Sequence, residues 1–323
     1  MNRRALLSGS AACMFDQIFA ATRDAIAEET SAFPVTVKHL HGETVIAARP
    51  RHVVSLGLND HDFAYALGVA PVGVTEWWGN RPYATWGWAE TVRTRLGAAP
   101  EIGGSRFLDY EWILALKPDL ILATYRDLDE RAYRKLSRIA PVVAPPRGYL
   151  MWTAPWESQL ALIARALGKS AEADKMTATV KRGVEQARRT LSSLSGKTVA
   201  VADFREGQFV LWDSRSAPTR FLRSLGLGVP PDLDALANHA GWIYLSLEQV
   251  RLLDIDLLIW PNNARNTVES LEIFRSLAIY RDGRNLWLSD ADPLASAALW
   301  FQSPLSILYL LDRLPALIFN QLR

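Results

Sequence analysis

The chain has 323 residues, a mass of 36.0 kDa and a formal net charge of +2, with 49% hydrophobic and 22% charged residues. This composition excludes a disordered chain and gives no strong basic field of the kind that nucleic-acid-binding proteins use. Its one cysteine, Cys13, excludes an internal disulfide framework and a thiolate zinc site. The length predicts about two domains.

The first residues have the pattern of an export signal. Two arginines precede a small-residue apolar run at residues 5–15, and residues 25–27 (Ala-Ile-Ala) form a small-x-small cleavage site. We therefore expect residues 1–27 to be a signal peptide of the Sec or twin-arginine type and the mature protein to be exported, to the periplasm or the outer face of the cell envelope. Cys13 is an alternative lipid-acceptor site.

From residue 50 the chain alternates short aliphatic runs with helical patterns, which predicts parallel sheets covered by helices. Strands are expected at 52–56, 72–74, 120–123 and 142–143, and helices at 59–67, 109–117 and 128–139. A helix expected over 171–194 would be about 36 Å long, which suits a connection between two domains. The alternation then resumes, with segments at 199–204, 209–212, 218–225, 247–253 and 257–260 and a terminal helix from Pro304.

The two halves repeat one pattern. A Glu-x-aliphatic-x-x-Leu-x-x-Asp-aliphatic motif begins at Glu111 and again 137 positions later at Glu248. Such self-similarity predicts two related lobes. The predicted fold is α/β, with lobes at 50–165 and 196–323, each holding a mainly parallel sheet flanked by helices. A single long helix within 166–195 would bridge them.

The first lobe contains an extra segment that is rich in aromatic residues. Phe63 and Glu111 are 48 residues apart, whereas the matching Phe221 and Glu248 are 27 apart. The extra segment contains four tryptophans, at positions 77, 78, 86 and 88. Open α/β sheets bind ligands beyond the carboxyl ends of their strands, so we expect this segment to border a ligand site.

Arginine and other polar or aromatic residues also follow the predicted strands or precede a predicted helix. They are Arg106, Tyr125, Arg126, Arg205, Asn262, Asn263 and Arg265. If the lobes face each other at this edge, guanidinium groups and indole faces would line a cleft that suits a flat, oxygen-rich, anionic ligand.

Signatures of enzymes are weak. The chain has no G-x-S-x-G, G-x-x-x-x-G-K-[ST], G-x-G-x-x-G or H-E-x-x-H motif. His61 is expected to be a polar surface group. Asp119 and Asp256 each precede a predicted strand, where a turn or helix-end hydrogen bond is the expected role. We therefore expect no catalytic residues and no direct metal ligands.

Several segments resemble one family in order and spacing. They lie at residues 51–57, 66–74, 111–121, 139–143, 245–248 and 303–305. The resemblance is to the bacterial substrate-binding proteins that serve ABC importers of ferric siderophores, haem and cobalamin. It covers residue 50 to the end. It implies two α/β lobes joined by one long helix, and capture of a ligand outside the cytoplasm without chemistry.

The resemblance also implies roles for single residues. Arg106, Tyr125 and Trp242 resemble the set that hydroxamate-siderophore binders use. Arg126, Arg205 and Arg265 resemble the set of catecholate binders, so the ligand class stays open. The full list of expected ligand-binding residues is Trp77, Trp78, Arg106, Tyr125, Arg126, Arg205, Trp212, Trp242, Tyr244, Asn263, Arg265 and Trp300.

Glu111 and Glu248 match the family glutamates, one on each lobe, that dock into basic pockets of the permease. The expected function is therefore binding of a ferric siderophore and its delivery to ABC importer permease subunits, by a monomer with no intrinsic cofactor. A haem or cobalamin binder of the same class is one alternative. A two-lobed α/β enzyme resembling a metal chelatase is another, although it would need Cys or His ligands that are scarce here.

Overall fold

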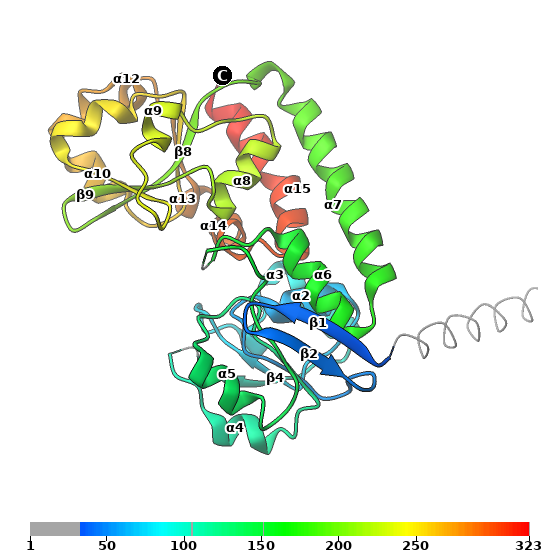
Figure 1. Ribbon diagram of the computed structural model, residues 1–323. Coiled ribbons are helices and arrows are strands. Elements are labelled where there is room, and N and C mark those ends of the chain that lie inside the picture. Colours follow the sequence, from blue (N-terminus) through cyan, green and yellow to red (C-terminus); the bar gives the residue numbers. More distant parts are fainter. Residues whose placement is uncertain (1–32, 105, 151, 323) are drawn as a thin grey trace, which may run out of the picture.

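The computed structural model describes residues 33–104, 106–150 and 152–322, so Cys13 and the signal peptide predicted over 1–27 lie outside the described residues. Two α/β lobes are joined by the long helix α7 (Ser170–Thr190) (Figure 1). This arrangement confirms the predicted fold class.

The N-terminal lobe is built on a five-stranded sheet in the order β5-β4-β3-β6-β7, in which all neighbours are parallel. Its strands are β3 (Val53–Ser55), β4 (Gly73–Thr75), β5 (Glu101–Gly103), β6 (Leu120–Leu122) and β7 (Val142–Val143). Consecutive residues of β3 alternate between the two faces: Val53 packs among the residues of α2 and α6, and Val54 among those of α4 and α5. Both faces are covered, which is why β6 is a continuous apolar run and β3 begins with two valines.

The helices of this lobe follow the predicted alternation. They are α2 (Asp60–Ala66), the 3₁₀ turn η1 (Pro82–Ala84), α3 (Gly87–Arg95), α4 (Tyr110–Ala115), α5 (Glu130–Leu136) and α6 (Trp156–Leu167). An antiparallel hairpin of β1 (Val35–His39) and β2 (Gly42–Ile46) lies ahead of residue 50 and packs on α6.

The second lobe has a mixed sheet in the order β10-β9-β8-β11-β12. Its strands are β8 (Val199–Arg205), β9 (Gln208–Trp212), β10 (Trp242–Leu245), β11 (Leu257–Trp260) and β12 (Asn285–Trp287). The neighbours β8, β11 and β12 are parallel, but β9 is antiparallel to β8 and to β10. The helices are α8 (Ala217–Ser224), α9 (Pro231–Asp234), the 3₁₀ helix η3 (Leu247–Leu253), α10 (Arg265–Ser270), α11 (Glu272–Arg275), α12 (Ala278–Arg281), α13 (Leu288–Ala291) and α14 (Pro293–Phe301).

The internal repeat is visible in local geometry. Asp119 accepts hydrogen bonds from the backbone N–H groups of Arg51 (2.7 Å) and His52 (2.9 Å), just before β3. Asp256 accepts equivalent bonds from the backbone N–H (2.8 Å) and hydroxyl (2.7 Å) of Thr198, just before β8. Both carboxylates therefore fasten the starts of two neighbouring strands through long-range bonds, where a local turn or helix-end bond was expected.

The lobes are held together by more than α7. A short 3₁₀ turn, η2 (Ser192–Leu194), follows α7, and the last helix, α15 (Pro304–Gln321), packs along α7 and also contacts α2 and α3 of the first lobe (Figure 1). At the start of α15 the hydroxyl of Ser303 donates to Asp62 of α2 at 2.7 Å, and the indole of Trp88 donates to the same carboxylate at 2.6 Å. The Ser303 bond ties the N-terminal lobe to the C-terminal helix, and the Trp88 bond holds the Asp62 carboxylate in place within the lobe.

The expectation that His61 lies on the surface is wrong. Asp60, His61 and Asp62 are all fully buried, because the first turn of α2 sits beneath α15 and beside α6. Burial lowers the pKa of His61 and raises the pKa values of Asp60 and Asp62.

His39 of β1 gives a testable pH dependence. Its ring donates to the hydroxyl of Thr44 at 2.8 Å, because that hydroxyl donates to the carbonyl of Val142 at 2.7 Å. Burial lowers the pKa of His39 to about 4. The unfolded chain therefore binds more protons below the ordinary histidine pKa, and the contribution of His39 to stability is present at neutral pH and is lost as the pH falls from about 6.5 towards 4.

The variant His39→Gln removes this titration. Between pH 7 and pH 4, the free energy of unfolding of wild type should fall by roughly 2–3 kcal/mol more than that of the variant. Urea denaturation at several pH values measures the difference. Parallel pH profiles for the two proteins would contradict this account of His39.

Candidate functional site

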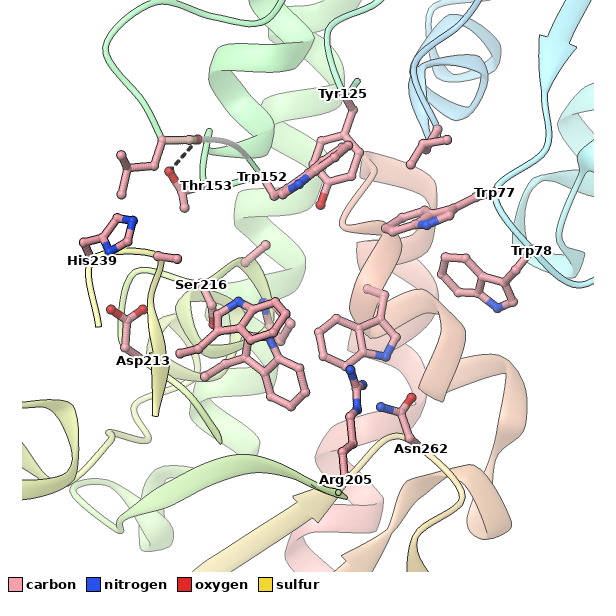
Figure 2. A pocket seen from close by; sticks show the side chains of 18 residues that line it. Trp77, Trp78, Tyr125, Trp152, Thr153, Arg205, Asp213, Ser216, His239 and Asn262 are labelled. Carbon is pink, nitrogen blue, oxygen red and sulfur yellow. Dashed lines mark hydrogen bonds between the residues drawn. The ribbon is translucent and has the colours of Figure 1, made fainter. Parts of the chain in front are cut away.

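A cavity of about 850 Å³ opens between the lobes (Figure 2). Its lining is dominated by six tryptophans and one tyrosine. The complete lining is Leu58, Trp77, Trp78, Tyr125, Leu150, Trp152, Thr153, Arg205, Trp212, Asp213, Ser216, Ala217, Pro218, His239, Ala240, Trp242, Asn262 and Trp300.

The wall from the first lobe stands at the carboxyl ends of its strands. Trp77 and Trp78 follow β4, and Tyr125 follows β6. Their rings are in contact, with centroids 4.3 Å apart for Trp77 and Trp78 and 5.5 Å apart for Trp77 and Tyr125. Figure 2 shows these three side chains along one side of the cavity. Trp86 and Trp88, from the same aromatic-rich segment, instead stack on each other and pack against Phe301.

The loop between β7 and α6 supplies Trp152, whose ring meets that of Tyr125 edge-on at 4.7 Å. Arg220 of α8, in the opposite lobe, holds this loop. Its guanidinium donates to the backbone carbonyls of Thr153 at 2.7 Å and Ala154 at 3.2 Å. The planar guanidinium of Arg220 thus connects the two lobes and holds the loop that carries Trp152.

The wall from the second lobe is formed by Trp212 at the end of β9, Trp242 at the start of β10 and Trp300 of α14. Because β9 runs antiparallel to β10, its last residue, Trp212, pairs with the first residue of β10, Trp242. The rings of Trp212 and Trp300 meet edge-on at 4.8 Å. The indole of Trp242 is 40% exposed.

The charged groups at the cavity are paired with charges of opposite sign. Arg205, at the end of β8, donates to the carboxylate of buried Asp203, and the side chain of Asn262 donates to the same carboxylate at 2.9 Å. The guanidinium of Arg205 also lies 5.7 Å from the ring of Trp212.

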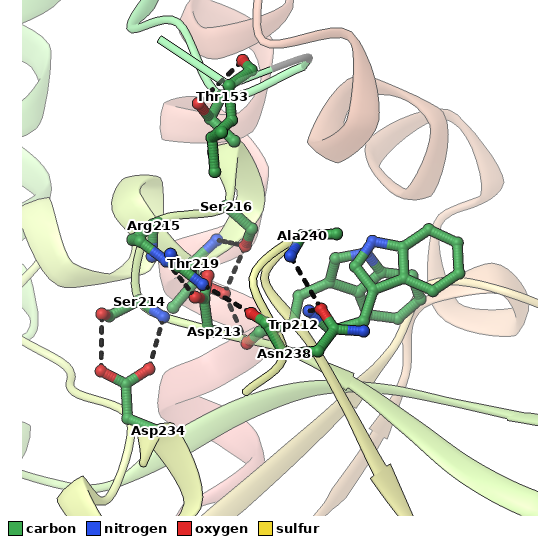
Figure 3. Close-up of polar contacts among 12 residues, drawn as sticks. Thr153, Trp212, Asp213, Ser214, Arg215, Ser216, Thr219, Asp234, Asn238 and Ala240 are labelled. Carbon is green, nitrogen blue, oxygen red and sulfur yellow. Dashed lines mark hydrogen bonds and ion pairs between the residues drawn. The ribbon is translucent and has the colours of Figure 1, made fainter. Parts of the chain in front are cut away.

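A second pair lies in the loop between β9 and α8 (Figure 3). The carboxylate of Asp213 accepts from the side chain of Arg215 and from its backbone N–H at 2.9 Å. Gly241 adopts φ +85°, and a Cβ there would come within 3.0 Å of the Asp213 carboxylate. Glycine is therefore required just before Trp242.

Neutral hydrogen-bond donors remain available at the cavity. In the described part of the chain, neither the hydroxyl of Tyr125 nor any indole N–H of the six lining tryptophans has a hydrogen bond to a protein acceptor. Burial raises the pKa of Tyr125, so its hydroxyl keeps its proton. These groups can donate to the oxygen atoms of a ligand.

Seven of the twelve residues expected at the ligand site line this cavity. They are Trp77, Trp78, Tyr125, Arg205, Trp212, Trp242 and Trp300.

The other five lie elsewhere. Arg106 is exposed beside Phe107, after the edge strand β5. Arg126 is 7% exposed and donates to the carbonyl of Leu56 at 3.2 Å, inside the first lobe. Tyr244 lies two residues after Trp242 on β10, which places it about 6.6 Å farther along the strand, on the same face of the sheet.

Asn263 lines an adjoining side cavity of about 300 Å³ that shares Trp78, Asn262 and Trp300 with the main one. Arg265 opens α10 and pairs with Glu269 at 3.1 Å and Asp290 at 3.3 Å, on the wall of a different surface cavity.

The list of expected residues omitted Trp152, Thr153, Asp213, Ser216, His239 and Asn262. Asn262 lies in the loop after β11, and the sequence had already placed it among the polar residues that follow the predicted strands. Trp152 lies in the loop after the last strand of the first lobe, so the rule used for Tyr125 would have found it. No sequence signal marked Asp213, Ser216 or His239, which reach the cavity because β9 turns back along β8 and β10 pairs antiparallel with β9.

Glu111 and Glu248 lie outside the cavity and are exposed. Each is the second residue of its helix, after the N-terminal caps Asp109 of α4 and Ser246 of η3. Within the described residues neither glutamate forms a salt bridge. The two lobes thus present one carboxylate each from equivalent positions.

Arg220→Lys tests the bridge between the lobes. A lysine keeps the charge but cannot hold both carbonyls, so the free energy of unfolding should fall by about 1–2 kcal/mol. The change Arg223→Lys, one turn away on the exposed side of α8, is the matched control and should have little effect. Urea denaturation measures both variants, and equal stability of the two would show that the Arg220 fork contributes nothing.

No three His, Cys, Asp or Glu side chains of the described residues lie together as a group that could hold a metal ion. None of the helices in the described ranges is both long and apolar enough to cross a membrane.

Comparison with known proteins places the chain in a family. The sequence profile described as "Periplasmic binding protein" matches residues 53–279. The chain is 28% identical over 204 residues to the probable siderophore-binding lipoprotein YfiY of Bacillus subtilis, covering 63% of this chain and 60% of that protein. It is 32% identical over 202 residues to the Fe(3+) dicitrate-binding periplasmic protein FecB of Escherichia coli, covering 62% and 63%. The matches thus span less than two thirds of the length of these relatives.

Solved structures match over more of the chain. A periplasmic solute binding protein from Mycobacterium smegmatis superposes with a TM-score of 0.80 at 32% identity, over 90% of this chain and 99% of that one. PiaA of Streptococcus pneumoniae, solved with ferrichrome, has the same fold, with a TM-score of 0.76 at 22% identity over 89% and 98% of the two chains. The match of the family profile to most of the chain and the shared two-lobed architecture lead to one conclusion: this chain belongs to the periplasmic binding protein family.

Proposed function

We propose that this protein captures a ferric siderophore in the cavity between its lobes and delivers it to the permease of an ABC importer, without catalysing a reaction. The observation that carries the proposal is the aromatic cavity of about 850 Å³ at the lobe junction, with free hydrogen-bond donors on both walls. Cavities of this size that bury an organic ligand are the common form of a small-molecule site. The names of YfiY and FecB, a siderophore binder and a ferric dicitrate binder, support the same reading.

Delivery requires a second surface, and Glu111 and Glu248 supply it. Exposed carboxylates on both lobes would meet basic groups of the permease and set the register of docking. The protein would work as an exported monomer, in the periplasm or at the outer face of the envelope. The contacts of α15 and Arg220 across the junction favour small lobe movements on binding.

A titration of intrinsic tryptophan fluorescence tests capture. The additions are a ferric hydroxamate, a ferric catecholate, ferric dicitrate, haem and cobalamin, and the proposal expects saturable quenching by at least one ferric siderophore. Quenching by haem or cobalamin alone would assign a different ligand within the family, and no saturable change with any of the five would refute capture in this cavity. Turnover of a chelate, seen as an altered product, would point to the chelatase-like alternative.

A further inference from the structure

Resting on the proposed function, we infer that the ligand is a ferric chelate without net charge, of the trihydroxamate class, rather than a multiply charged catecholate or carboxylate complex. The inference comes from the charge balance of the cavity and from the kind of donors that its walls present.

The cavity walls carry no surplus of positive charge. Arg205 is the one lysine or arginine among the described lining residues, and Asp203 neutralises it. The lining carboxylate of Asp213 is neutralised by Arg215. The adjoining side cavity of about 300 Å³ has no charged residue among its described lining.

The arginines that would have suited an anion are engaged elsewhere. Arg126 donates to the carbonyl of Leu56, and Arg265 pairs with Glu269 and Asp290. Arg220 directs its fork at the carbonyls of Thr153 and Ala154. An anion entering the cavity would therefore find, among these three, no guanidinium free to bind it directly, and losing its water without such a partner is costly in a desolvated site.

The free donors include the hydroxyl of Tyr125 and the indole N–H groups of the six tryptophans, which are all neutral and are set in a surface of aromatic rings. Iron(III) held by three singly charged hydroxamates is neutral overall and presents carbonyl and N–O oxygens as acceptors on an apolar body. Iron(III) held by three doubly charged catecholates is a trianion. Neutral donors and aromatic faces match the first and leave the charge of the second unpaired.

Isothermal titration calorimetry with three chelates tests the inference. They are ferrichrome, which is a neutral ferric trihydroxamate, a hexadentate ferric tris-catecholate, and ferric dicitrate. Ferrichrome should bind at least roughly 100-fold more tightly than either anion, a difference of two tenfold steps in Kd. Its affinity should change less than about twofold between about 0.05 and 0.5 M NaCl, because screening acts little on a neutral ligand.

Charge variants sharpen the test. Asp203→Asn removes the carboxylate that neutralises Arg205, which leaves a net positive charge on the cavity wall. Asn262→Lys adds a positive charge beside Arg205 and is a second way to the same change in charge. Each variant should lower the ratio of the Kd of the tris-catecholate to the Kd of ferrichrome by roughly tenfold, because the added positive charge attracts the anionic chelate. Asp232→Asn makes the same change in net charge at an exposed residue away from the cavity and should leave the preference unchanged.

Failure of the inference about charge and failure of the proposed function give different results. If either anion binds as tightly as ferrichrome, the inference about charge is overturned while capture of a ferric siderophore stands. If none of the three chelates binds saturably, the proposed function itself is refuted.

Discussion

Replacing Trp242 by alanine is expected to weaken binding of the ferric siderophore by about 30-fold or more. The side chain lies on the cavity wall, 40% exposed, where it would cover one face of the ligand. Truncating a central aromatic anchor of an interface commonly costs about 2 kcal/mol or more, which corresponds to that factor. Calorimetric titration of wild type and variant with the same chelate measures the loss.

Tyr244→Ala is the matched control for this prediction. Tyr244 stands on the same strand, β10, two residues from Trp242, and is 45% exposed, but it does not line the cavity. Both changes should alter the free energy of unfolding by less than about 1 kcal/mol, because both side chains are at the surface. Equal losses of affinity in the two variants would mean that the ligand does not contact Trp242 in this cavity.

The second large effect is expected on transport rather than on binding. The double change Glu111→Lys and Glu248→Lys should lower uptake of radioiron chelate by cells by roughly 100-fold or more, because both carboxylates that would meet the permease are reversed in charge. Affinity for the chelate, measured on the purified variant, should stay within about twofold of wild type, since neither residue lines the cavity.

Glu272→Lys controls for a change of surface charge. Glu272 is also an exposed glutamate in the first turn of a helix, α11, but it is not part of the repeated pair. Cells with this variant should take up iron at the wild-type rate. Normal uptake by the double variant, or a loss of its chelate affinity, would remove Glu111 and Glu248 from the docking surface.

The sequence predicted the fold well because its signals are local and repeated. Strands such as β6 are short continuous apolar runs, and the repeated motif places β6 and β11 in equivalent sheet positions, each beside the first parallel strand of its lobe. The sequence did not reveal that the second sheet mixes parallel and antiparallel strands. The β8–β9 turn inserts an antiparallel strand where the first lobe continues directly to a helix, and pairing direction is decided by tertiary contacts.

The site was predicted in part, for reasons that differ between residue types. Tyr125 and Arg205 were found because they follow strands, and strand order fixes where such residues lie. Arg126 also follows a strand, yet its long side chain turns inward to the carbonyl of Leu56. The acceptor that an arginine reaches depends on neighbours far away in the sequence, so position alone predicts its direction poorly. His61 was misplaced for the same reason, since α15, far along the chain, is what covers it.

The most direct test of capture between the lobes is the position of iron in crystals grown with a saturating ferric siderophore. Anomalous scattering at the iron absorption edge should give one strong peak inside the cavity, between Trp77 of the first lobe and Trp242 of the second. A strong iron peak at any other place, with this cavity left free of chelate, would contradict the central claim.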